Sequence, residues 1–144
     1  MPCKRIRRGF SLVELAVVVI IIGVLAAFGL PRMLRVVERS KAGEAFQFLA
    51  NVRSAQERHQ ARQGIYAVDI ADLDIVDQTP LEYFTVGVIG PGGTGSLEDS
   101  WSLTLTRNGA SSGYGAYTVT FNQSGYDPVN STIDALPEIN PNGT

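Results

Sequence analysis

The feature that most constrains this chain is an uncharged apolar run near its N-terminus, from Leu15 to Leu30. Counted from Phe10, the segment has 21 residues, which would extend about 31 Å as an α-helix. That length matches the roughly 30 Å hydrocarbon core of a bilayer. One carboxylate, Glu14, stands at the start of the run, where a charge in lipid costs about 2.5–3.5 kcal/mol. The run therefore predicts a membrane-spanning helix. The cost of its carboxylate predicts that Glu14 has a specific interaction partner.

An ordinary secretory signal peptide explains the run poorly. Such a peptide has an apolar core of roughly 7–15 residues followed by a small-x-small cleavage site, whereas this run is longer and no Ala-x-Ala site follows it. A plain membrane anchor would explain the length and the basic residues before it, which favour a cytoplasmic N-terminus. A plain anchor does not explain Glu14 or the Gly9-Phe10 pair.

Together with the apolar run, the residues before it resemble the N-terminus of type IV prepilins, which type IV pilins share with type II secretion pseudopilins, and the resemblance covers roughly residues 1–66. The resemblance rests on a short basic leader, on Gly9 followed by Phe10, and on Glu14 four residues after that phenylalanine. It implies that a prepilin peptidase cleaves after Gly9 and methylates the new amine of Phe10. It also implies that Glu14 pairs with the Phe10 amine of a neighbouring subunit, so that each buried charge offsets the cost of the other.

Gly23, Gly29 and Pro31 are predicted to interrupt the helix. Proline removes a backbone donor and disfavours helix at the residue before it. By resemblance to pilins, the segment between Gly23 and Pro31 can unwind in the filament. A simple kink at the membrane surface is the alternative.

Residues 32–63 show the pattern of an amphipathic helix, with Gly64 as its C-terminal cap. Charged residues such as Arg35 and Glu38 are expected on the solvated face. One stripe of residues recurs at steps of three and four and is expected to pack on a core. This stripe consists of Ala42, Ala45, Phe46, Leu49, Val52 and Gln56.

Two segments of alternating apolar and hydroxyl residues, 101–106 and 116–121, predict antiparallel strands, and residues 81–88 predict a third. Trp101, Leu103 and Leu105 should face the helix stripe. The expected fold class is α+β: a long N-terminal helix, transmembrane in its first half, packs through its second half on a small antiparallel sheet. The predicted divisions are a leader (1–9), a transmembrane assembly helix (10–31), an amphipathic helix (32–64) and a β-rich head with a C-terminal tail (65–144).

Charge is segregated along the chain, and this limits the possible functions. The net charge is −2, but without residues 1–9 eight basic and fourteen acidic residues remain, a net of −6. After Gly64 the only basic residue is Arg107, against ten acids. Because nucleic-acid binding needs a basic surface, no direct contact with nucleic acid is expected. Cys3, the only cysteine, lies in the leader, so the processed chain would have no disulfide.

No catalytic constellation is recognisable in the sequence, so neither enzymatic activity nor a cofactor is expected. Type II major pseudopilins bind calcium in a C-terminal loop, and resemblance to them offers Asp127, Asn130 and Asp134 as candidate ligands. Their spacing does not fit a calcium loop, and no metal site is predicted.

The expected function is that of a structural subunit of a type IV pilus or pilus-like filament. A type II secretion pseudopilin or minor pilin is the alternative within the family, and a membrane-anchored binding module is the alternative outside it. The partners implied by the resemblance are identical subunits in a helical filament, a prepilin peptidase and methyltransferase, a membrane platform with an assembly ATPase, and the lipid bilayer before assembly. The implied location is the bacterial cytoplasmic membrane, with the head outside the cytoplasm, and then a periplasmic or extracellular filament.

Overall fold

The structure is a computed structural model that describes residues 9–75, 81–109 and 113–143. Of the predicted leader, only Gly9 lies within these ranges. The chain divides into two compact units, the first ending at Leu34 and the second beginning at Arg35. One helix, α1 (Leu12–Gln63), contributes its first part to the first unit and the rest to the second.

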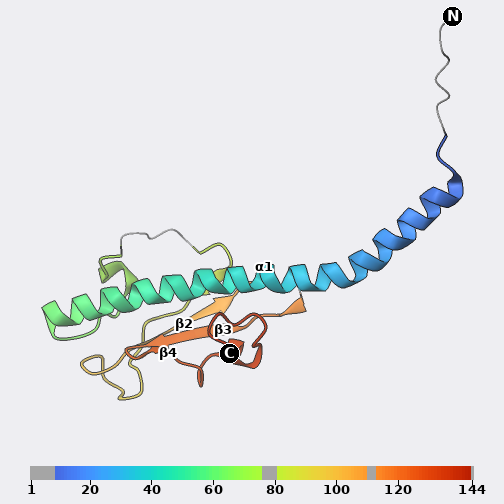
Figure 1. The fold of residues 1–144 in the computed structure, drawn as a ribbon. Coiled ribbons are helices and arrows are strands. Elements are labelled where there is room, and N and C mark those ends of the chain that lie inside the picture. Colours follow the sequence, from blue (N-terminus) through green and yellow to red (C-terminus); the bar gives the residue numbers. More distant parts are fainter. Residues whose placement is uncertain (1–8, 76–80, 110–112, 144) are drawn as a thin grey trace, which may run out of the picture. The chain divides into compact units, whose positions relative to one another are not determined.

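The second unit is an α+β fold in which a four-stranded antiparallel sheet lies along α1 (Figure 1). Its strands are β1 (Phe84–Val86), β2 (Ser102–Arg107), β3 (Thr118–Asn122) and β4 (Gly125–Tyr126). The strands are ordered β1-β2-β3-β4, so that each pairs with its neighbour in sequence. The two predicted strands, 101–106 and 116–121, are confirmed as an antiparallel pair, since Leu103 pairs with Phe121 and Leu105 with Val119.

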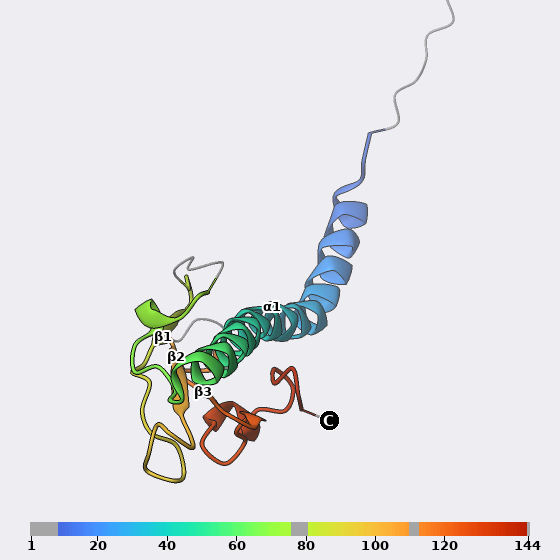
Figure 2. The same cartoon turned by 90° about the vertical axis from the view of Figure 1, so that its left-hand side faces the viewer.

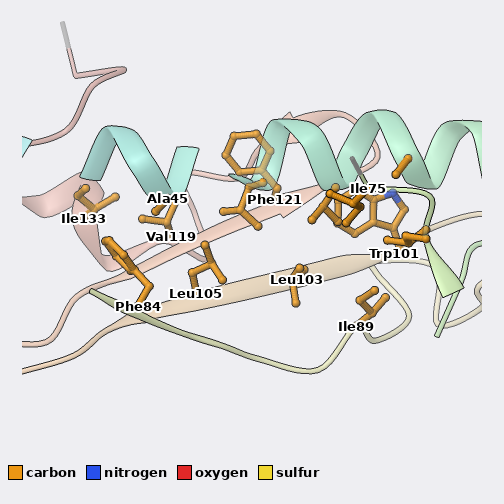
Figure 3. Packing of buried hydrophobic residues seen from close by; sticks show 14 of the residues in the cluster. Ala45, Ile75, Phe84, Ile89, Trp101, Leu103, Leu105, Val119, Phe121 and Ile133 are labelled. Carbon is orange, nitrogen blue, oxygen red and sulfur yellow. The ribbon is translucent and has the colours of Figure 1, made fainter. Parts of the chain in front are cut away.

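The core of the second unit lies between α1 and the inner face of the sheet. Trp101, Leu103 and Leu105 are at most 1% exposed, as the alternation of strand residues predicts (Figure 3). From α1, the predicted stripe supplies Ala42, Ala45, Leu49, Val52 and Gln56 to the interior. Phe46, the remaining member of the stripe, is partly buried at the edge of the core.

The chain reverses direction after α1 because Gly64 adopts a left-handed conformation, with φ of +80°, that L residues rarely adopt. The returning segment is fixed by Gln56, whose buried side chain donates to the Ala67 carbonyl oxygen at 3.0 Å and accepts from the Ala67 N–H at 2.8 Å. This pair of bonds explains how a polar side chain can lie in the apolar stripe, because a buried amide with both groups bonded avoids the cost of desolvation. A short 3₁₀ helix, Ile70–Asp72, follows.

The C-terminal segment packs on the sheet rather than extending as a free tail (Figure 2). It contains the 3₁₀ helix Thr132–Ala135, and the side chains of Ile133 and Ile139 are fully buried. The Ser131 hydroxyl accepts a hydrogen bond from the Thr120 N–H at 2.8 Å, which ties the segment to β3.

Candidate assembly site

The first part of α1 exposes an apolar surface on all sides. Each large apolar side chain from Leu12 to Val37 is at least 40% exposed, and the extremes of the range are Leu12 at 89% and Val37 at 40%. Among the described residues, α1 is the one helix long and apolar enough to cross a membrane. A soluble chain rarely leaves so large an apolar surface uncovered, because each such side chain gains about 1.5–3 kcal/mol when it is buried. This surface is suited to contact with lipid or with other helices.

The residues predicted for processing lie at the start of this surface. Gly9 and Phe10 precede α1 and are exposed, with Phe10 at 73%. Glu14 lies in the first turn of α1 and is also exposed. Within the described chain, it makes no ion pair. A carboxylate in a first turn is favoured by the positive end of the helix dipole, and here it remains open to a partner from another chain.

The structure continues α1 without interruption through Gly23, Gly29 and Pro31. A Cβ atom added at Gly23 or Gly29 would meet no other atom within 4 Å, so neither glycine is required by close packing in the single chain. Pro31 leaves one carbonyl oxygen of the preceding turn without its helical donor, a defect of about 3 kcal/mol in a helix interior. The turn before Pro31 is therefore the weakest of the segment from Gly23 to Pro31. Unwinding of this segment in a filament stays a prediction.

A buried charge cluster joins α1 to the sheet close to the start of the second unit. Glu38 is 1% exposed, which shows that the expectation of a solvated Glu38 was wrong. Its carboxylate accepts hydrogen bonds from Arg107 Nε at 2.6 Å, from Arg107 Nη2 at 3.3 Å and from the Tyr117 hydroxyl at 3.0 Å. Lys41 Nζ lies 3.6 Å from the same carboxylate. Arg107, itself 3% exposed, also donates to the carbonyl oxygens of Tyr83 and Asn108.

The cluster holds its charges in their ionised forms. Burial would raise the pKa of Glu38, but the hydrogen bonds from Arg107 and Tyr117 and the charges of Arg107 and Lys41 outweigh it, so the pKa lies below its usual value. The hydrogen bond to Glu38 raises the pKa of Arg107 despite burial. Burial and the charge of Glu38 raise the pKa of Tyr117, so its hydroxyl remains a donor. Since 69 residues separate Glu38 from Arg107, the cluster fixes the end of β2 against one turn of α1.

The candidate calcium ligands are engaged in two separate hydrogen-bond networks. Asp127 accepts from the Asn130 side chain at 2.8 Å and from the Val129 N–H at 3.1 Å. The hydrogen bond from the Asn130 side chain is the main reason that the pKa of Asp127 is lowered. Asp134 instead accepts from Tyr126 and from Asn140, each at 3.3 Å. Across the ranges that the structure describes, no three His, Cys, Asp or Glu side chains gather as a metal site.

Comparisons with known proteins match the N-terminal segment to a family model and most of the chain to fimbrial proteins. Residues 4–30 match the model of the prokaryotic N-terminal methylation motif. Fimbrial protein EcpC of Eikenella corrodens is 28% identical over 124 residues, which are 86% of this chain and 79% of that protein. Fimbrial protein EcpB of the same organism is 28% identical over 135 residues, 92% of this chain and 74% of that protein.

A third relative matches a shorter stretch. The type IV major pilin protein PilA of Myxococcus xanthus (strain DK1622) is 40% identical over 60 residues, 42% of this chain and 27% of that protein. No solved structure matches the chain significantly. The methylation motif, the fimbrial relatives along most of the chain, and a fold of one long apolar helix with a small antiparallel sheet agree with one another. The chain therefore carries the prokaryotic N-terminal methylation motif, is similar to fimbrial proteins over most of its length, and is similar to a type IV major pilin over a shorter stretch.

Proposed function

We propose that this chain is a structural subunit of a type IV pilus or pilus-like filament, and not an enzyme. The observation that carries the proposal is the exposed apolar surface of the first part of α1, which lies largely within the methylation motif of residues 4–30. In the membrane this surface is covered by lipid. In a filament it would be covered by the same surface of other copies, so that each helix exchanges lipid contacts for protein contacts.

Processing would prepare the N-terminus to exchange lipid contacts for contacts with other copies. Cleavage after Gly9 removes four basic residues and creates an α-amino group on Phe10, which the methyltransferase modifies. Lipid tails are as apolar as leucine, so apolar contact alone gives helices little reason to associate in a membrane. The Phe10 amine of one copy and Glu14 of another would supply that reason, because two opposite charges in an apolar medium are far less costly together than apart. Glu14 is thus a docking group.

The first test is mass spectrometry of the filaments sheared from cells. A dominant peptide that begins with N-methylated Phe10 is the expected result. An unprocessed chain that retains residues 1–9, in cells with a working prepilin peptidase, would contradict the proposal. A processed chain present only in trace amounts in the filaments would favour a minor pilin or a pseudopilin.

Two substitutions separate processing from assembly. Gly9→Glu should block cleavage and leave the leader in place, because it changes the residue before the cut. Glu14→Val should be cleaved normally but yield few filaments, because it removes the anion and leaves the cut unchanged. Normal filament yield with Glu14→Val would exclude the charge pairing while leaving the structural role intact.

The remaining partners and the location follow from this role. Before assembly the subunit would lie in the cytoplasmic membrane, with its second unit outside the cytoplasm. A membrane platform and an assembly ATPase would then extract it into the filament. Fractionation of cells that lack the ATPase tests this order, since the processed chain should accumulate in the cytoplasmic membrane and be absent from sheared filaments.

A further inference from the structure

Two arginines near the start of the second unit form an exposed basic patch on α1. We define the basic patch as Arg35, Val36 and Arg39; Val36 is 66% exposed, and both arginines are exposed. Among the residues that the structure describes, neither arginine has an ion-pair partner. Like charges four residues apart on a helix repel each other. The described part of the chain therefore presents two neighbouring exposed cations that an anion from another molecule could pair with.

The far end of the same unit carries the opposite charge. The acidic patch consists of exposed side chains on the loop after α1 and on the turn before β2, namely Val68, Asp69, Asp72, Asp74, Glu98 and Asp99. Both segments are tied to the last turns of α1. Arg58 donates to the Asp74 carbonyl oxygen, and Gln60 donates to the Glu98 carbonyl oxygen, each at 2.9 Å. Arg58 and Arg62 lie at this end as well, and the five acids leave it net negative.

The two patches cannot meet within one copy. From Val36 to Gln60, α1 extends about 35 Å along its axis, which is far beyond the reach of an ion pair. Between two copies they are complementary, since each offers charges of one sign beside an exposed valine. Contact between two different patches is heterologous, and a heterologous contact that does not close into a ring generates an open helical array.

We propose that the basic patch of one copy docks on the acidic patch of a second copy in the filament. The inference rests on the proposed function and adds to it a contact between the second units, separate from the apolar helix and from Glu14. Arg35 and Arg39 form ion pairs with Asp72 and Asp74 of the other copy, and Val36 packs against Val68. Because these pairs lie at the surface, the contact weakens as salt is raised.

Charge reversal with rescue tests the contact in the full chain, expressed with its assembly machinery. Arg35→Glu with Arg39→Glu should reduce the amount of sheared filament about tenfold, the effect of two partly exposed ion pairs lost at each contact. Adding Asp72→Arg and Asp74→Arg should restore the yield. The matched control adds Glu138→Arg, a reversal of an exposed acid outside the acidic patch, and should restore nothing.

A cysteine pair gives an independent readout, because Cys3 is the only cysteine of the chain. In a Cys3→Ser background, Arg39→Cys with Asp72→Cys should give disulfide-linked ladders in oxidised filaments, whereas Arg39→Cys with Glu138→Cys should not. The docking contact would be overturned if filaments were abundant, showed no disulfide-linked ladder, and lost no yield on charge reversal. The proposed function would then still stand. Absence of filaments from the parent chain would overturn both. Normal filaments from the reversed variant, with weaker binding to vesicles of anionic lipid, would assign the arginines to lipid headgroups and overturn the contact.

Discussion

The two parts of α1 use apolar residues in opposite ways. Up to Leu34 the helix is apolar on every side and buries none of its described side chains. From Arg35 onward, seven residues of α1 are buried against the second unit, and three of these are alanines that let the helix approach the sheet closely. The comparison shows that one helix can carry two kinds of surface, one that its own chain covers and one that its own chain leaves exposed.

The largest effect on the stability of the second unit is expected from breaking the buried charge cluster. Arg107→Met would leave the Glu38 carboxylate buried without its main partner, which should lower the free energy of unfolding by about 3–5 kcal/mol. Urea unfolding of the full chain in detergent, followed by near-ultraviolet circular dichroism, measures this loss. Glu57→Ala is the control, because it removes an exposed pair with Arg53 and should cost less than about 1 kcal/mol. Equal losses would show that burial of the cluster does not matter.

A matched pair of leucines tests the difference between the two parts of α1 directly. Leu49→Ala should lower the free energy of unfolding of the second unit by about 2–5 kcal/mol, since Leu49 is fully buried and its loss leaves a cavity. Leu25 is 67% exposed, so Leu25→Ala should change that free energy by less than about 0.5 kcal/mol. The same Leu25 variant should reduce filament yield. A large unfolding effect from Leu25→Ala would contradict the division into two surfaces.

Acid should weaken the second unit through Glu38. Its pKa is lowered in the folded chain despite the opposing effect of burial, so the stability that it contributes is present above its unfolded pKa of about 4.3. That contribution is lost as the pH falls through the lower folded value. The unfolding free energies of wild type and Glu38→Gln should therefore converge below about pH 4. A constant difference from pH 7 to pH 3 would exclude this linkage.

The smallest effects should have opposite signs at two glycines. Gly64→Ala should destabilise the second unit by about 1 kcal/mol, because alanine would have to adopt the left-handed φ of +80°. Gly29 is helical and has open space around its Cα atom, so Gly29→Ala should raise the helix content of the first unit in micelles, with a gain of about 0.5–1 kcal/mol. Far-ultraviolet circular dichroism of the two variants in the same detergent measures both. Destabilisation by Gly29→Ala would indicate a role for this glycine in packing between copies.

Periodicity was sufficient to predict most of the fold. Steps of three and four along α1 and alternation in β2 and β3 identified the buried faces, since one side of a helix or a strand packs on the core. The C-terminal segment was less accessible to such reasoning, because short 3₁₀ turns and side-chain bonds to β3 leave no repeating pattern. The N-terminal methylation motif was predictable because it is a local pattern of residues around Gly9 and Phe10.

The buried charge cluster was missed because charged residues were assigned to the solvated face. Both members of the pair nonetheless extend the apolar patterns. Glu38 lies four residues before Ala42 on the buried stripe, and Arg107 lies two residues after Leu105 on the inward face of β2. The buried charge cluster could have been found from this pattern. A charged residue stands at a position of the buried face of α1, and one residue of opposite charge stands at a position of the buried face of β2.

The position of Trp101 has a practical consequence. It is the only tryptophan of the chain, its side chain is completely buried, and within the described residues its indole N–H has no hydrogen-bond partner. The ring of Tyr66 lies 6.4 Å away and can transfer excitation energy to it. The intrinsic fluorescence of the unlabelled protein therefore reports on the second unit alone, whether the apolar helix is in detergent, in lipid or in a filament.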